Sequence, residues 1–251
     1  MSNCHTFGLL ALLVIILSTF IEDITLKFNQ IKQLFHALYL TNSFGLRLRR
    51  TQDPMEKKRL RLGYSLAQLE ALNISVKVEN KEKLPQKGQF LFVSNHRTII
   101  DPPIVEIALK ETDIFGLWVA KKELYNSVFF GMFVRNAGCV LLDREKEQMG
   151  GFFADIKKGV KEGSSIFIFP EGTRNKTEAP LIPFKEGARL IALKNRLPML
   201  PLYIKGNAAE VLKAALLDSK PHREITIVIG DLIDYKEKRP LQEVYEERFG
   251  L

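Results

Sequence analysis

Apolar and polar positions follow two periods along most of the chain, one typical of buried strands and the other of helices. Short apolar runs bounded by turn residues predict strands at residues 74–78, 89–93, 113–120, 140–142, 165–169, 199–204 and 225–229. Apolar residues three or four positions apart predict helices at residues 60–72, 124–133, 152–160, 185–194 and 208–217, with a further helix starting at Asp101-Pro102-Pro103. Strands separated by helices indicate an α/β fold, with a mostly parallel sheet flanked by helices.

The N-terminal region has a different pattern. Residues Phe7 to Ile21 carry no charge. As a helix they would be roughly 22 Å long, against about 30 Å for the hydrocarbon core of a bilayer. An amphipathic pattern follows, with apolar positions at Ile24, Phe28, Ile31, Phe35 and Leu38. A set of basic residues comes next, which we call the basic collar: Arg47, Arg49, Arg50, Lys57, Lys58, Arg59 and Arg61.

These features predict an N-terminal membrane-associating helical pair that enters one leaflet, with the basic collar on the lipid head groups. A helical hairpin of the core and a single membrane span are the alternatives. We therefore expect residues 1–72 to form the membrane-associating region and residues 73–251 to form the α/β domain.

The chain of 251 residues has a formal net charge of +8, which suggests nucleic acid, phosphorylated substrates or an acidic membrane surface as partners. The charge lies beside lipid-like sequence rather than among aromatics on a polar surface, so we expect no nucleic-acid partner. The two cysteines, Cys4 and Cys139, indicate neither a disulfide framework nor a metal site. No G-x-G-x-x-G or Walker loop is present, so nothing indicates a nucleotide cofactor.

Candidate chemistry lies between the strand at 89–93 and the helix that starts at Asp101. We expect Asp101 to be the N-cap of that helix, with His96 in the loop before it. A loop can fold the imidazole onto the carboxylate, which would leave the other ring nitrogen free to remove a proton. Ser94 has no G-x-S-x-G elbow around it, so the reacting hydroxyl would come from a substrate. The alternative is that Asp101 only caps the helix and that His96 is a surface residue.

A second candidate loop, Phe169-Pro170-Glu171-Gly172-Thr173-Arg174, follows the strand at 165–169. It would reach the same sheet edge as His96 if the two strands run parallel. The glycine permits a tight turn, and an arginine fork can hold a phosphate with two hydrogen bonds. Taken alone, the loop is equally typical of a strand-end turn with a solvated arginine.

Taken together, the motifs resemble the glycerophospholipid acyltransferase family, and within it the 1-acylglycerol-3-phosphate acyltransferases. The resemblance covers roughly residues 73–205. It rests on four blocks in order: His96-x-x-x-x-Asp101, Gly138-Cys139-Val140-Leu141-Leu142-Asp143-Arg144, Glu171-Gly172-Thr173-Arg174 and Leu197-Pro198-Met199-Leu200-Pro201-Leu202.

The resemblance implies that His96 is the general base and Asp101 its orienting partner. It implies that an acyl group moves from a thioester of acyl carrier protein or coenzyme A to the sn-2 hydroxyl of lysophosphatidate, giving phosphatidate, with no metal or other cofactor. Expected acceptor contacts are Glu171, Gly172, Thr173, Arg174 and Arg144, and we add Lys121, which follows a strand end. Glycerol-3-phosphate or another lysophospholipid as acceptor, and a non-enzymatic membrane-surface adaptor, remain alternatives.

A reaction between a bilayer lipid and a water-borne thioester requires a site open to both phases. We therefore expect the protein to sit on the cytoplasmic face of a phospholipid membrane, as a monotopic protein rather than a single span.

Overall fold

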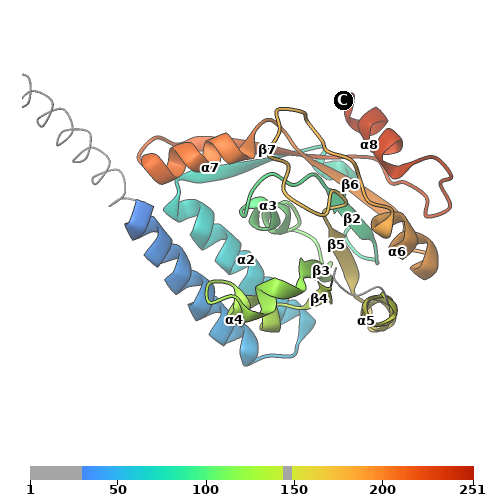
Figure 1. The fold of residues 1–251 in the computed structure, drawn as a ribbon, viewed down its shortest axis with the longest axis horizontal. Helices are drawn as coiled ribbons and strands as arrows, with labels where there is room; N and C mark the ends of the chain where they lie inside the picture. The colour runs from blue at the N-terminus through green and yellow to red at the C-terminus, as the bar shows by residue number, and fades with distance from the viewer. Residues whose placement is uncertain (1–29, 144–148) are drawn as a thin grey trace, which may run out of the picture.

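The computed structural model describes residues 30–143 and 149–251, and its elements form one seven-stranded sheet covered by helices (Figure 1). The strands are β1 (Ile74–Glu79), β2 (Leu91–Ser94), β3 (Gly116–Lys121), β4 (Cys139–Leu142), β5 (Ser165–Ile168), β6 (Met199–Ile204) and β7 (Arg223–Ile229). The helices are α2 (Pro54–Ala71), α3 (Asp101–Ala108), α4 (Gly131–Asn136), α5 (Gly150–Lys161), α6 (Gly187–Asn195), α7 (Ala208–Leu217) and α8 (Leu241–Phe249), together with a helix over residues 30–49 and the 3-10 turns η1 (Lys81–Lys83) and η2 (Lys122–Asn126).

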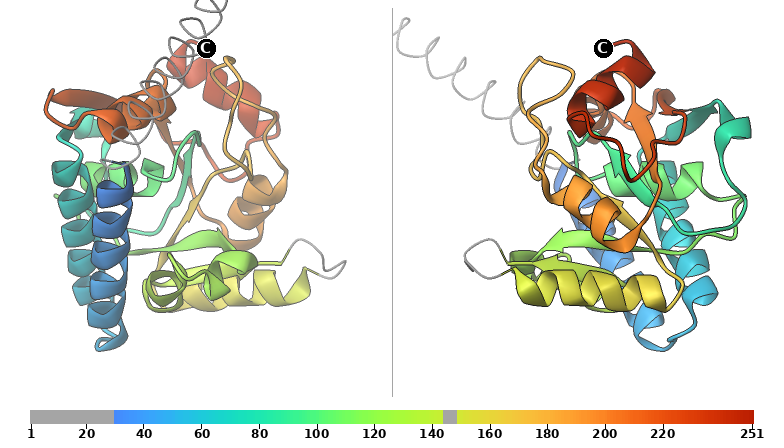
Figure 2. Two further views of the ribbon diagram at one scale, coloured as in Figure 1. Left: turned by 60° about the vertical axis from the view of Figure 1, so that its left-hand side comes forward. Right: turned by 90° about the vertical axis from the view of Figure 1, so that its right-hand side faces the viewer.

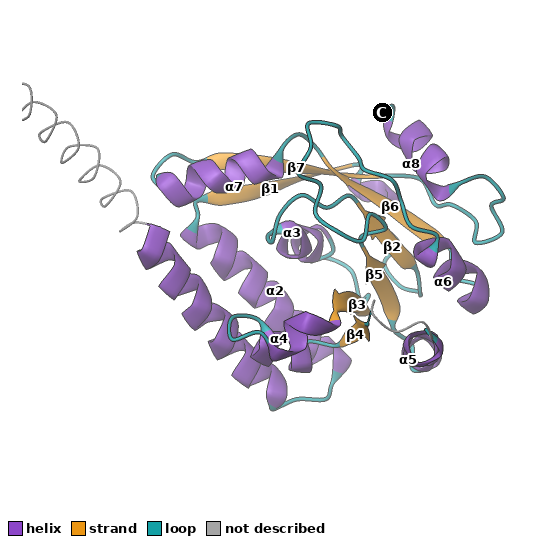
Figure 3. Ribbon diagram, viewed as in Figure 1, coloured by secondary structure: helices purple, strands orange, loops and turns teal. Residues whose placement is uncertain are grey.

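The strand order is β1-β7-β6-β2-β5-β3-β4, and every neighbouring pair is parallel except β6 and β7. The expected α/β fold with a mostly parallel sheet is therefore confirmed. The antiparallel pair is joined through α7, and the chain enters β7 from the same edge of the sheet at which it leaves β6 (Figure 3).

Helices cover both faces of the sheet, as the views in Figure 2 show. On one face, α2, α3 and α7 pack through residues such as Leu69, Ile104 and Ala215. On the other face, α5, α6 and α8 pack through residues such as Ile156, Ile191 and Tyr245. Burial on both faces explains why the central strands are nearly continuous apolar runs rather than alternating ones.

The helix at residues 30–49 and α2 form a hairpin that lies along the side of the molecule (Figure 1). Asp53 caps α2, because its side chain accepts a hydrogen bond of 2.9 Å from the backbone N–H of Glu56, and Pro54 occupies the first turn. The end of the hairpin packs on α4 and the start of β4 through Leu48, Leu60 and Ala137. In the described part of the chain no helix is both long and apolar enough to cross a membrane.

Three local predictions were wrong. Lys58 and Arg61 of the basic collar, expected on the lipid head groups, are buried, because Lys58 bonds the carbonyl of Thr112 and Arg61 pairs with Glu106. The helix expected at 124–133 is divided into η2 and α4, because the Ser127 side chain and carbonyl bond the backbone N–H groups of Phe130 and Gly131 and start a new helix there. Asp101 is the first residue of α3 rather than its N-cap, which is Ile100. The Asp101 carboxylate instead turns back to the preceding loop. The uncharged segment at residues 7–21 lies outside the described residues.

Candidate functional site

The two candidate loops meet at one edge of the sheet. Strands β2 and β5 are parallel neighbours, and Val93 is paired with Ile168 in the last register position. The chain therefore leaves both strands at the same edge, and the loop after each strand begins beside the other. The backbone N–H of Asn175 donates a 2.6 Å hydrogen bond to the carbonyl of His96, so the loops are bonded to each other directly.

His96 and Asp101 form the expected pair. The Nδ1 atom of His96 lies 2.8 Å from Oδ2 of Asp101, whose side chain is 1% exposed while that of His96 is 18% exposed. The same oxygen accepts hydrogen bonds from the backbone N–H groups of Arg97 (2.6 Å) and Thr98 (2.8 Å). Because Nδ1 donates to the carboxylate, Nε2 of the neutral ring is left as the basic nitrogen.

Glu171 connects the second loop to the histidine. Its Oε1 accepts a 2.7 Å hydrogen bond from the backbone N–H of His96, and its Oε2 accepts a 3.2 Å bond from the N–H of Ile182. The residue is almost fully buried, and this burial raises the pKa of its carboxyl group to about 7, although the two backbone hydrogen bonds act in the opposite direction. Contact between Glu171 and a substrate phosphate remains a prediction.

An aromatic stack supports the imidazole ring on its face. The rings of His96 and Phe169 are 4.0 Å apart and almost parallel, at 9°. Phe169 in turn stacks on Trp118 at 5.3 Å. Stacking of this kind holds the plane of the imidazole, while the bond to Asp101 fixes its rotation within that plane.

A buried ion pair holds the far end of the stack. The indole Nε1 of Trp118 donates a 2.7 Å hydrogen bond to Glu106, which also lies 2.5 Å from the guanidinium of Arg61. Arg61 donates further bonds to the carbonyls of Gly116 and Ala137. One continuous set of contacts therefore joins α2, α3, β3 and the histidine. Trp118, Glu106 and Arg61 were not predicted as site residues from the sequence. The one feature that could have indicated them is that the single tryptophan of the chain lies close to the end of a predicted strand.

The other predicted site residues that the structure describes lie at or near the same edge. Gly172 has a φ of +70°, and its N–H closes a turn onto the carbonyl of Phe169, so the turn itself requires glycine. Thr173 and Arg174 follow this turn and are exposed. Lys121 is exposed at the end of β3, the parallel neighbour of β5. Arg144 lies outside the described residues.

The side chain of Arg97 joins the His96 loop to the loop that follows β5. Its guanidinium donates hydrogen bonds of 3.0 Å to the carbonyl of Thr177 and 2.5 Å to that of Ala179. The residues after Arg174 are thereby fixed against the loop that carries His96. The site presents a supported, partly exposed imidazole, and the exposed Arg174 immediately precedes Asn175, whose N–H bonds the His96 carbonyl. Such an imidazole is suited to removing a proton from a bound substrate.

Comparisons with known proteins identify the family of the chain. The acyltransferase family model matches residues 75–205, slightly more than half of the chain, so the chain belongs to the acyltransferase family. The family expected from the four sequence blocks is thus confirmed.

Curated relatives with the name 1-acyl-sn-glycerol-3-phosphate acyltransferase include proteins from Helicobacter pylori and Bacillus subtilis. The chain is 36% identical to the Helicobacter pylori protein over 118 residues, which are 47% of this chain and 48% of that one. It is 32% identical to the Bacillus subtilis protein over 136 residues, which are 54% of this chain and 65% of that one. The matched part thus spans about half to two thirds of the length of these relatives.

The fold is also that of a solved structure. The crystal structure of the 1-acyl-sn-glycerophosphate (LPA) acyltransferase PlsC from Thermotoga maritima matches with a TM-score of 0.66 and 21% identity, over 91% of this chain and 93% of the other.

Proposed function

We propose that the protein transfers an acyl group from a thioester to the sn-2 hydroxyl of lysophosphatidate, giving phosphatidate. The observation that carries the proposal is the 2.8 Å contact between Nδ1 of His96 and the buried carboxylate of Asp101, in a chain of the acyltransferase family. The names of the curated relatives support lysophosphatidate as the acceptor.

In this reaction Nε2 of His96 accepts the proton of the acceptor hydroxyl as its oxygen attacks the thioester carbonyl. A carbon–oxygen bond forms, the carbon–sulfur bond breaks, and the proton passes to the departing thiolate. Asp101 stabilises the imidazolium that exists between these proton transfers. No acyl-enzyme forms, because the attacking hydroxyl belongs to the acceptor.

The acceptor phosphate binds beside the histidine. Arg174 is the main contact, since its exposed guanidinium follows the Gly172 turn and can form two charge-assisted hydrogen bonds. Lys121, Thr173 and Arg144 add further contacts. Glu171, whose two oxygens already bond backbone N–H groups, acts first by holding the His96 loop in place.

The donor is an acyl thioester of acyl carrier protein or coenzyme A, and the reaction requires no metal or redox cofactor. The enzyme works on the cytoplasmic face of a membrane. Exposed apolar side chains on the helix at residues 30–49, among them Phe35 (65% exposed) and Tyr39 (69% exposed), support attachment to a membrane surface. The uncharged segment at residues 7–21 would deepen the attachment.

An acceptor panel tests the proposal. The purified full-length protein is given an acyl thioester with lysophosphatidate, glycerol-3-phosphate or lysophosphatidylcholine, and the products are identified by mass spectrometry. We expect phosphatidate from the first acceptor. Acylation of glycerol-3-phosphate alone would transfer the proposal to that acceptor, and no acyl transfer to any acceptor would favour a membrane-surface adaptor.

A further inference from the structure

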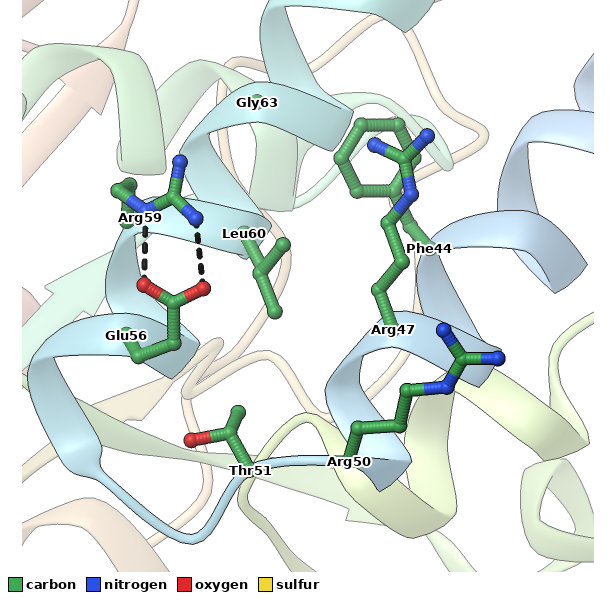
Figure 4. Close-up of a pocket in the computed structure, with 8 residues that line it drawn as sticks. All are labelled: Phe44, Arg47, Arg50, Thr51, Glu56, Arg59, Leu60 and Gly63. Carbon is green, nitrogen blue, oxygen red and sulfur yellow. Dashed lines mark hydrogen bonds and ion pairs between the residues drawn. The ribbon is translucent and has the colours of Figure 1, made fainter.

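A pocket of about 480 Å³ opens between the helix at residues 30–49 and α2, next to the turn that joins them (Figure 4). No residue of the His96 loop or of residues 169–174 lines it, so it is separate from the proposed reaction site. Phe44 and Leu60 form apolar walls, and Thr51 adds a hydroxyl group at the turn. The pocket is therefore a second place where a ligand can bind.

The pocket has an excess of positive charge. Arg59 is neutralised, because it forms two hydrogen bonds of 2.7 and 2.6 Å with Glu56. On the opposite wall, the guanidinium of Arg47 lies over the ring of Phe44 at 4.9 Å, and Arg50 extends nearby (Figure 4). Neither Arg47 nor Arg50 has a carboxylate partner in the described part of the chain. Two arginines on one wall are suited to a phosphate group, which guanidinium binds through paired hydrogen bonds.

An apolar hollow adjoins this pocket, and Arg47 and Arg50 line both of them. The hollow follows one face of the helix at residues 30–49 through Phe35, Leu38, Tyr39 and Leu46. Arg47 lies twelve positions after Phe35, which corresponds to roughly 18 Å along a helix. One leaflet of the hydrocarbon core is about 15 Å deep. The apolar face therefore matches an acyl chain whose head group is at the arginines.

From this juxtaposition we propose that the hairpin holds one phospholipid with a terminal phosphate, bound by Arg47 and Arg50, with an acyl chain along Phe35 to Leu46. A phosphomonoester carries about −1.5 to −2 charges near neutral pH, which two arginines match better than they match the single charge of a phosphodiester. The site thus selects the head group, whereas the exposed residues of the basic collar respond only to surface charge. The proposal does not depend on the proposed reaction, although that reaction's lipids belong to the same chemical class.

Vesicle binding of the full-length protein tests the site. Three vesicles are compared: phosphatidylcholine alone, phosphatidylcholine with phosphatidate, and phosphatidylcholine with phosphatidylglycerol adjusted to the same surface potential. We expect phosphatidate vesicles to bind more tightly than phosphatidylglycerol vesicles by about fivefold to thirtyfold, the effect of one or two exposed charge pairs. The double substitution R47Q/R50Q should remove this preference.

Two control variants separate this site from general surface charge and from the reaction site. K32Q/R49Q removes two charges from the same helix outside both hollows, and should weaken binding to both anionic vesicles while leaving their ratio unchanged. The vesicle comparison is also made in an Arg174→Ala background, which removes phosphatidate binding at the proposed acceptor site, and the loss of preference on adding R47Q/R50Q should be the same there.

The proposal is overturned if the wild type shows no preference, if the preference survives R47Q/R50Q, or if K32Q/R49Q removes it equally well. Competition distinguishes a lipid from a free anion. Inorganic phosphate that displaces a soluble short-chain phosphatidate at equal concentration would show that the apolar hollow contributes nothing, and would overturn the lipid assignment. Displacement only at much higher phosphate concentration supports it.

Discussion

Replacing Glu171 by glutamine removes the charge that holds the His96 loop but keeps the shape of the side chain. The wild-type carboxylate accepts one backbone N–H on each oxygen, from His96 and Ile182. An amide has only one accepting oxygen, so one of these N–H groups loses its partner. Leaving a buried donor unpaired costs about 1–3 kcal/mol of stability.

The same substitution also removes a free-energy cost that the wild-type protein carries, namely the cost of ionising a buried carboxyl group. A rise of the Glu171 pKa from 4.5 to about 7 means that the folded protein resists ionisation of this group. After allowance for solvent screening, this is roughly 2 kcal/mol above pH 7. The two effects nearly cancel, so Glu171→Gln should change the free energy of unfolding above pH 7 by no more than about 1 kcal/mol.

The pH dependence gives the sign of the effect. Between pH 4.5 and about 7 the folded state keeps a proton on Glu171 that the unfolded state releases, so this group's contribution to stability is full below that window and is lost as pH rises through it. Denaturant unfolding at several pH values should show this fall in the wild type. The fall should be absent in Glu171→Gln and unchanged in Glu178→Gln, an exposed control in the same loop.

Turnover should respond differently from stability. A backbone shift of about 1 Å at a catalytic group can cost on the order of 10²-fold in rate. We therefore expect a large loss of kcat in Glu171→Gln with the acceptor KM unchanged. A wild-type kcat would refute the anchoring role, and a raised KM with normal kcat would show that Glu171 contacts the acceptor.

Further predictions concern the acceptor site, the supporting contacts and the membrane. Arg174→Ala should raise the KM for lysophosphatidate by tenfold or more, since each hydrogen bond to a charged group contributes about 1.5–3 kcal/mol. The KM for an acceptor without a phosphate should not change in Arg174→Ala, and the control Lys176→Ala should leave both KM values unchanged. Equal losses for both acceptors would show that Arg174 has a structural role. Glu106→Gln leaves Arg61 as a buried unpaired charge and should lower the unfolding free energy by about 3–5 kcal/mol, whereas a loss below about 1 kcal/mol would contradict that reasoning. Phe169→Leu should lower kcat about tenfold with KM unchanged, whereas Phe169→Tyr should keep kcat near the wild-type value. The reason is that a flat aromatic ring, rather than a side chain of similar volume, holds the imidazole in its plane. Removal of residues 1–29 should lower the fraction of the protein that is recovered with membranes. High salt should not release the full chain from membranes, since salt screens charges but leaves apolar insertion intact. Complete release by salt would contradict insertion.

Predictions from the sequence succeeded where the local signal and the tertiary structure agree. The helix Ala208–Leu217 was predicted at its observed bounds, because Asn207 caps a continuous run of helix formers. The segment at 124–133 failed, because its apolar periodicity continues across Ser127, whose side-chain bond interrupts the helix. Helix α8 was missed altogether.

The site was predictable in part for the same reason. His96 and Asp101 are five residues apart, so chemistry and chain reach sufficed to pair them. The bond from Glu171 to the His96 backbone spans 75 residues, and the stack of Trp118, Phe169 and His96 joins three strands or loops. Such contacts depend on strand order, and no spacing within the sequence encodes that order.

The central claim is that His96 removes the proton of a lipid hydroxyl. Its most direct test is acyl transfer to lysophosphatidate by folded wild-type and His96→Ala proteins, with phosphatidate measured by mass spectrometry and folding verified by the unfolding transition. We predict phosphatidate formation by the wild type and a loss of turnover of roughly 10²–10⁴-fold in the variant. Near-normal turnover in folded His96→Ala protein would contradict the claim.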